Sequence, residues 1–151
     1  MFASRLPGIV TPLEVTMASD PSRDTSFRCT IAPWLSVRNS ARAVDFYKSA
    51  FGATEAYRLD GPDGSVVARL SVDGAEFWVS DESPEHSNFS PEFLHGGSVR
   101  MILTVVDPDA RFARALAGGA SEVYPVSEGH GWRVGRVVDP FGHHWEIGRP
   151  L

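Results

Sequence analysis

The chain has 151 residues, of which 42% are hydrophobic and 22% charged, and it carries a formal net charge of −5. A chain of this length buries one substantial hydrophobic core, which excludes two large domains. The acidic balance argues against binding to a nucleic-acid backbone, and no apolar run approaches the ~20 residues of a membrane span, which argues against a membrane protein.

The first 26 residues do not have the pattern of a folded element. Proline, glycine and acidic residues interrupt their short apolar stretches, which excludes a signal-peptide core. We expect residues 1–26 to form a flexible tail and residues 27–151 to form the folded domain. Met1 and Met17 can each be the true start, and the sequence leaves both open.

The chain has one cysteine, Cys29, so an intrachain disulfide is excluded. This usage suits a reducing compartment, and we expect a cytoplasmic protein. Cys29 opens a predicted strand, where a free cysteine most often acts as a small apolar residue. We therefore expect Cys29 to be buried.

The first half of the chain predicts a strand followed by a helix. Residues 30–37 are typical of a strand, and Ser40 is a good N-cap for a helix over residues 41–51. The apolar residues of this helix fall on one stripe, at Ala43, Val44, Phe46, Tyr47, Ala50 and Phe51. Gly52 then supplies the C-terminal stop.

Three more strands are predicted after this helix, with glycine-containing turns between them. They cover residues 53–59, 66–72 and 75–80. Together these elements form a βαβββ module over residues 28–80. Residues 81–97 are rich in serine, proline, glutamate and asparagine, and we expect them to form a linker.

The second half of the chain repeats this order. A β-branched strand over residues 99–106 precedes an Asp-Pro pair, which combines an N-cap acceptor with proline at the first helical position. Two glycines end the helix that follows. Aligning Gly52 with Gly119 gives an offset of 67 residues and also brings Ser40 onto Asp107. The start and the end of the two helices therefore agree.

Strands over residues 121–126, 133–138 and 143–148 complete a second module over residues 98–149. We therefore predict an α+β fold of two tandem βαβββ modules. Their sheets would form a cup-shaped mixed sheet with the helices outside, and its concave face is the natural place for a ligand. Whether one chain forms the cup, or modules from two chains do, stays open.

Three motifs resemble the vicinal oxygen chelate superfamily, which includes glyoxalases, bleomycin-resistance proteins and extradiol dioxygenases. They are PWLSV at residues 33–37, AVDFYK at residues 43–48 and DPFGH at residues 139–143. The resemblance covers residues 28–149 and is strongest to the small bacterial glyoxalase-like subgroup. It implies the glyoxalase-like fold, a small-molecule ligand and a homodimer.

Active metalloenzymes of this superfamily hold a divalent metal with one ligand from the first strand and one from the last strand of each module. The resemblance places Glu146 at one of these four positions. The other three positions hold Trp78, Ala32, and either Val99 or Met101. A single carboxylate holds a metal weakly, so we expect no metal cofactor.

His144 complicates this expectation. Residues two apart on a strand point to the same face, so His144 and Glu146 could hold a metal together. We favour a hydrogen-bonded histidine beside a carboxylate, because two ligands are fewer than metal sites use. His143 points to the other face, and we expect it to pack against a turn or the helix layer.

The concave face offers a group of candidate ligand-binding residues. They are Trp34, Trp78, Met101, Trp132, His144 and Glu146. Aromatic rings around a carboxylate suit a flat or cationic molecule. The leading hypothesis is a metal-independent binder of a small aromatic or cationic molecule, with antibiotic sequestration as a use. The plainer alternative is that Trp34 and Trp78 fill the core.

Whether the protein is an enzyme stays open. One alternative function is that of a lyase, isomerase or dioxygenase with a non-standard divalent-metal site at His144 and Glu146. Another is metal-free acid–base catalysis by Glu146, the best catalytic candidate, since a carboxylate in an aromatic pocket can serve as a base.

Overall fold

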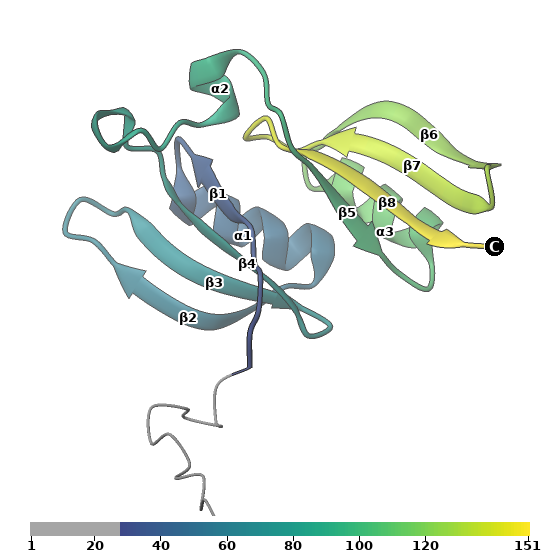
Figure 1. Ribbon diagram of the computed structural model, residues 1–151, viewed down its shortest axis with the longest axis horizontal. Helices are drawn as coiled ribbons and strands as arrows, with labels where there is room; N and C mark the ends of the chain where they lie inside the picture. Colours follow the sequence, from purple (N-terminus) through teal and green to yellow (C-terminus); the bar gives the residue numbers. More distant parts are fainter. Residues whose placement is uncertain (1–27) are drawn as a thin grey trace, which may run out of the picture. The chain divides into compact units, whose positions relative to one another are not determined.

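A computed structural model describes residues 28–151, and residues 31–151 form one unit (Figure 1). The expected flexible tail and the choice between Met1 and Met17 lie outside the described residues. Cys29 is exposed, so the expectation that it is buried is wrong. The reason is that the first strand begins only at Trp34, after Cys29.

Each half of the unit contains one long helix and four strands. In chain order the first half consists of β1 (Trp34–Val37), α1 (Ser40–Phe51), β2 (Thr54–Asp60), β3 (Val66–Val72) and β4 (Ala75–Asp81). The second half consists of β5 (Arg100–Thr104), α3 (Pro108–Ala117), β6 (Ser121–Gly129), β7 (Trp132–Val138) and β8 (His144–Pro150). The segment between them, expected to be a plain linker, contains η1 (Pro84–His86) and α2 (Pro91–Leu94).

The strands form two four-stranded mixed sheets of the same topology. Their orders are β1-β4-β3-β2 and β5-β8-β7-β6. In each sheet the first strand pairs parallel to the last strand, and the other pairs are antiparallel. The predicted α+β fold of two βαβββ modules is therefore confirmed. None of the helices within residues 28–151 has the length and apolar character needed to cross a membrane.

The start of α1 differs from the prediction by one residue. Asn39 is the N-cap, and its side chain accepts a hydrogen bond from the backbone N–H of Arg42. Ser40 is instead the first helical residue and is buried, where its Oγ accepts from the N–H of Val66 on β3 at 2.7 Å. The helix ends as predicted at Gly52, whose φ of 69° lies in the left-handed region.

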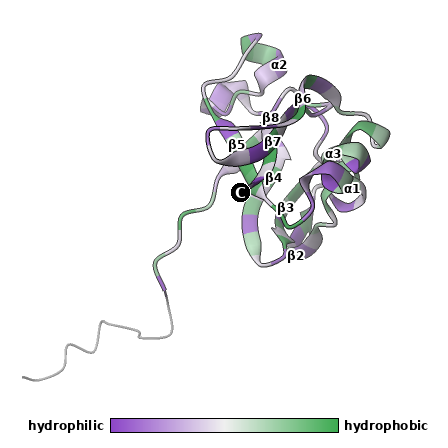
Figure 2. Cartoon of the chain, turned by 90° about the vertical axis from the view of Figure 1, so that its right-hand side faces the viewer, coloured by the Kyte–Doolittle hydropathy of each residue, from purple (hydrophilic) through white to green (hydrophobic). Residues whose placement is uncertain are grey.

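The two faces of each sheet differ in burial. Along β3, every second residue from Val66 to Val72 is buried against α1, and the residues between them are half-buried. Figure 2 shows hydrophobic and hydrophilic residues interspersed along the strands, as this alternation requires. We call the face opposite the helix the open face of each sheet. The core lies on the helix sides, and α1 contacts α3.

A buried carboxylate connects the two modules. Asp139, in the turn between β7 and β8, is 4% exposed. Its Oδ2 accepts hydrogen bonds from the Tyr47 hydroxyl of α1 at 2.7 Å and from the Trp145 indole of β8 at 2.9 Å. Its Oδ1 accepts from the backbone N–H groups of Phe141 and His143, both at 2.9 Å. Both oxygens therefore have two donors each, as a buried charge requires.

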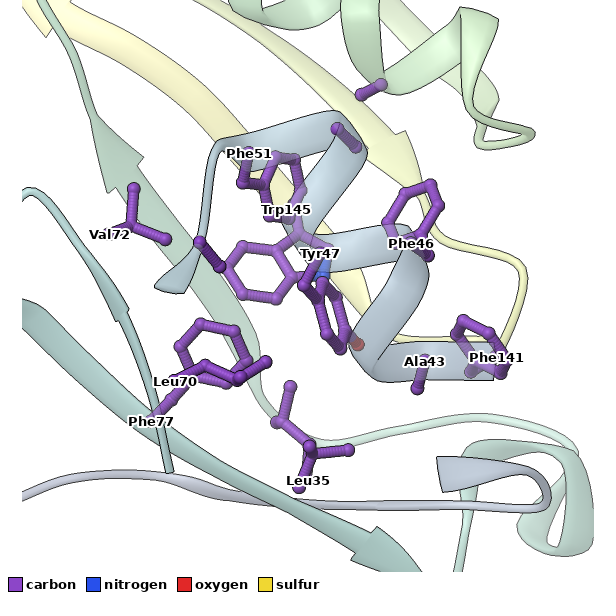
Figure 3. Packing of buried hydrophobic residues seen from close by; sticks show 14 of the residues in the cluster. Leu35, Ala43, Phe46, Tyr47, Phe51, Leu70, Val72, Phe77, Phe141 and Trp145 are labelled. Carbon is purple, nitrogen blue, oxygen red and sulfur yellow. The ribbon is translucent and has the colours of Figure 1, made fainter. Parts of the chain in front are cut away.

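The donors to Asp139 belong to an aromatic cluster shared by the two modules. Trp145 lies beside Phe51 and Tyr47 of α1, with ring centroids 4.6 Å and 5.5 Å away (Figure 3). Phe77 of β4 contacts the edge of the same indole at 5.5 Å. A side chain of the second sheet thus completes the core of the first module, and the two modules cannot pack independently.

This arrangement predicts how stability depends on Tyr47. Burial, and next the charge of Asp139, raises the pKa of Tyr47 well above its ordinary value. Tyr47→Phe should cost about 2 kcal/mol of unfolding free energy at neutral pH, because a hydrogen bond to a buried charge is lost. Above about pH 10 only the unfolded wild type ionises Tyr47, so its stability should fall by about 1.4 kcal/mol per pH unit relative to the variant.

Urea denaturation of the wild type and of Tyr47→Phe measures their free energies of unfolding. The difference between the two should be smaller at alkaline pH than at neutral pH. Tyr124→Phe is the matched control, because Tyr124 is 62% exposed, and it should leave stability unchanged at neutral pH. An equal penalty for Tyr47→Phe at all pH values would contradict the raised pKa.

Candidate functional site

A row of side chains crosses the open face of the first sheet. Tyr57 is the strand partner of Arg69, Arg69 of Trp78, and Trp78 of Trp34. We call these four residues the aromatic row. The row forms because strand partners in register point to the same face of a sheet.

The two tryptophans of the aromatic row stack on each other. Their ring centroids are 5.2 Å apart, and their planes differ by 14°. The Trp34 indole donates a hydrogen bond to Ser80 Oγ at 2.8 Å, which fixes its orientation. Trp34 is 56% exposed, so the plainer alternative that it fills the core is wrong. Tyr57, 45% exposed, extends the aromatic surface at 5.7 Å from Trp78.

A cation already covers part of this surface. The guanidinium of Arg69 lies 5.6 Å from the centroid of the Trp78 ring, a distance typical of a cation–π contact. Its Nε also lies 3.7 Å from Oε2 of Glu76, on the same open face. Both the positive charge and the ring of the aromatic row therefore have partners within the first sheet.

The second sheet has a row at the matching place. Tyr124 is the strand partner of Arg136, Arg136 of Glu146, and Glu146 of Ile102. We call these four residues the charged row. Tyr124 and Arg136 follow Tyr57 and Arg69 by 67 residues each, the offset of the repeat. The sequence alone contains this repeated pair of tyrosine and arginine. The strand pairing shows that each pair lies on the open face of its sheet.

The carboxylate of the charged row is held by arginine. Arg100 Nε lies 3.0 Å from Glu146 Oε1, and Arg136 is the direct strand partner of Glu146. Glu146 is therefore paired with a guanidinium and does not lie in the aromatic pocket expected for a catalytic base. Arg136 Nε and His144 Nδ1 are buried without a hydrogen-bond partner. A buried polar group without a partner costs about 1–3 kcal/mol, and the Arg136 Nε–H lacks an acceptor.

His144 shares the open face with Glu146, as the sequence predicts. Burial lowers the pKa of His144 below its ordinary value, and the positive charge of Arg136 lowers it further. The Asp139 carboxylate opposes this effect. The imidazole is therefore held neutral over a wider pH range than an exposed histidine would be.

The donors on the open faces do not fit the divalent metal of the metalloenzymes. Within residues 28–151, no group of three or more His, Cys, Asp or Glu side chains could hold a metal. Glu146 is engaged by Arg100, and its twin position holds Trp78. A second cation beside Arg136 would also be repelled.

The predicted ligand-binding residues fall into separate groups. Trp34 and Trp78 meet on the first sheet, whereas His144, Glu146 and Trp132 lie on the open face of the second sheet. No hydrogen bond, ion pair or aromatic contact within the described residues joins the two groups.

Met101 lies on the helix side of β5, packed against the core, so it does not share a face with Glu146. The open face of β5 presents Ile102 and Arg100 instead, because the strand is aligned one residue away from the expected register. His143 is also placed differently: its Nε2 is 3.0 Å from the carbonyl oxygen of Ser36 on β1, so it contacts a strand of the first sheet, not a turn or helix.

Trp34 and Met101 meet at a hollow of about 340 Å³ between β1, α2 and β5. Its wall also includes Phe89 and Leu94 from the segment between the modules and Val99 before β5. The wall is mainly apolar, and His143 is its one titratable residue. A concave apolar surface with few polar groups is typical of a small-molecule site.

The comparisons with known proteins agree with this fold. The family described as a glyoxalase-like domain matches residues 34–148. An uncharacterized protein of Mycobacterium tuberculosis is 41% identical over 126 residues, which cover 80% of this chain and 74% of that protein.

Two solved structures are also similar. A gene product of Arabidopsis thaliana has a TM-score of 0.60 at 32% identity, covering 80% of this chain and 96% of that one. TioX from Micromonospora sp. ML1 has a TM-score of 0.64 at 30% identity, covering 82% of this chain and 100% of that one.

The charge around His144 gives a direct prediction. Its imidazole should titrate below the ordinary value of 6.5. Arg136→Gln should raise the pKa of His144, because it removes the positive charge that lowers this pKa most. The measurement is an NMR titration of the histidine ring protons. Arg149→Gln, on the same strand but the other face, should leave the titration unchanged, and an equal effect of both variants would contradict the assignment.

Proposed function

The chain belongs to the family of glyoxalase-like domains, and we propose that it binds a small planar aromatic molecule without the help of a metal. The observation that carries this proposal is the stack of exposed Trp34 on half-buried Trp78 on an open sheet face. An aromatic ring laid on such a stack gains both apolar burial and a favourable ring–ring geometry.

The fixed orientation of Trp34 supports the proposal. Its hydrogen bond to Ser80 holds the indole in place before a ligand arrives. Binding then requires little ordering of this side chain, which favours affinity. The hollow beside Trp34, with Met101 and Phe89 in its wall, provides room for substituents of the ligand.

The charges favour a neutral aromatic ligand over a cationic one. Arg69 already occupies a position over the Trp78 ring, so a second cation would meet its repulsion. The expected negative partner, Glu146, belongs to the other sheet and is paired with Arg100. The sequence suggested an aromatic or a cationic ligand, and of these two we propose the aromatic one.

Binding without conversion is the proposed mode of action. Glu146 is not free to take a proton from a ligand while Arg100 engages its oxygen, which disfavours the acid–base alternative. A protein that holds a planar molecule in this way lowers its free concentration. Sequestration of an aromatic antibiotic is one use of that property.

We also propose that the protein is a cytoplasmic homodimer. Its single cysteine suits a reducing compartment, and Ile102, 67% exposed on the open face of β5, is an apolar side chain that a second copy would cover. Light scattering during size-exclusion chromatography should give twice the mass of one chain. Ile102→Glu should lower that mass to one chain, and a monomeric wild type would contradict the proposal.

Ligand binding is measured by tryptophan fluorescence. A panel of neutral, cationic and anionic planar aromatics should contain compounds that quench the emission saturably. Trp78→Ala should weaken the Kd of such a compound by about fivefold, since ring stacking contributes about 1 kcal/mol beyond burial. Trp132→Phe is the control, because it removes a tryptophan from the other sheet, and it should leave the Kd unchanged.

Two results would contradict the proposed function. One is the absence of saturable quenching by every compound of the panel. The other is a stoichiometric metal in the purified protein that is lost in Glu146→Ala, which would favour the lyase, isomerase or dioxygenase alternative at His144 and Glu146.

A further inference from the structure

We propose that the open face of the second sheet holds an oxyanion, bound by the guanidinium of Arg136 with Arg100 and His144 beside it. The class of ligand is a phosphate, a sulfate or the carboxylate of an organic molecule. This site is separate from the aromatic row and does not depend on the function proposed for it.

The first argument is charge. Arg136 makes no hydrogen bond or ion pair with any of the residues described, although it faces Glu146 across the strand pair. Glu146 instead makes its ion pair with Arg100. Two guanidiniums and one carboxylate leave one positive charge without a counterpart. A half-buried positive charge of this kind is stabilised by an anion.

The second argument is the unfilled donors. Arg136 Nε and His144 Nδ1 are both buried, and neither has a hydrogen-bond partner among residues 28–151. Their residues lie on the open face of the adjacent strands β7 and β8, at diagonal positions two residues apart in the register. An oxyanion offers several acceptors in a small volume, and a guanidinium binds two oxygens with its parallel N–H groups. His144 would then carry its proton on Nδ1.

The matching position of the first sheet supports this assignment. Arg69 also has a buried Nε without a hydrogen bond. There, however, Glu76 lies 3.7 Å away and the Trp78 ring accepts the cation. Among the described residues Arg136 makes no such contact with a ring or a carboxylate, because Glu146 stands where the first sheet has Trp78 and is paired with Arg100. Arg69 therefore has partners for its charge in the first sheet, whereas the equivalent Arg136 has none among the described residues of the second.

Two neighbours of Arg136 on the open face are exposed to solvent. Tyr124, its partner on β6, is 62% exposed, and Arg100 is exposed at the edge strand β5. An oxyanion can therefore reach Arg136 from the solvent. The Tyr124 hydroxyl is a further donor on the same row.

The test is a titration of the full chain with inorganic phosphate, followed by the NMR signal of the arginine Nε–H groups. Phosphate should shift the Arg136 signal saturably, and sodium chloride at the same ionic strength should not. In calorimetry, Arg136→Gln should weaken phosphate binding at least tenfold, and Arg136→Lys, which keeps the charge but loses the planar pair of donors, should weaken it less. Arg149→Gln removes a charge from the other face of β8 and should change the affinity less than twofold.

Benzoate, as a competitor of phosphate, distinguishes the two sources of the anion. Displacement of phosphate by benzoate supports the carboxylate of an organic ligand, and its failure supports a free inorganic anion. Trp78→Ala should keep full phosphate affinity, so the aromatic site can fail without affecting this result. An Arg136 signal that shifts equally in chloride, or an equal loss of affinity in Arg136→Gln and Arg149→Gln, would overturn the proposal.

Discussion

The buried carboxylate of Asp139 is the interaction on which the rest of the structure depends. A charge removed from water must be surrounded by donors, and here they come from a helix of one module and from a turn and a strand of the other. The Tyr47 hydroxyl can reach Asp139 only if the two modules pack in one way. The same turn leads directly into β8, so the network also sets which residues of that strand face the core and which face the open side. Trp145 is turned inward, and His144 and Glu146 are turned outward as a consequence.

The two sheets have the same topology but carry different side chains on their open faces. Each row begins with the same pair, tyrosine and then arginine, and differs at the next two positions. In the first sheet these positions hold two tryptophans, which stack and expose an apolar surface. In the second they hold Glu146 and Ile102, and the exposed surface is ionic. The chain therefore combines a surface for rings with a surface for charge, whereas a metal site would need carboxylate or imidazole at both centres.

Much of the fold was predictable from the sequence because the signals are local. Helix caps, glycine stops and the period-two alternation of β3 depend on neighbours in the chain, and they placed most elements within one or two residues. The contact of Tyr47 with Asp139 joins residues far apart in the chain, and no local pattern marks it. The same applies to β5: a shift of one residue moves every side chain to the opposite face, which is why Ile102, not Met101, lies beside Glu146. The ion pair of Glu146 with Arg100 could not be predicted either, because it depends on the same register of β5.

The arginine that recurs at positions 69 and 136 bears on which substitutions the two open faces can accept in evolution. A guanidinium accepts a flat ring or a carboxylate as its neighbour, since it can lie over the one and bind the oxygens of the other. The residue across the strand pair is a ring beside Arg69 and a carboxylate, paired with Arg100, beside Arg136. One substitution at position 78 or 146 exchanges an aromatic centre for an acidic one. The open faces can thus differ between the two halves, whereas the buried carboxylate of Asp139 needs the same four donors whatever the open faces carry.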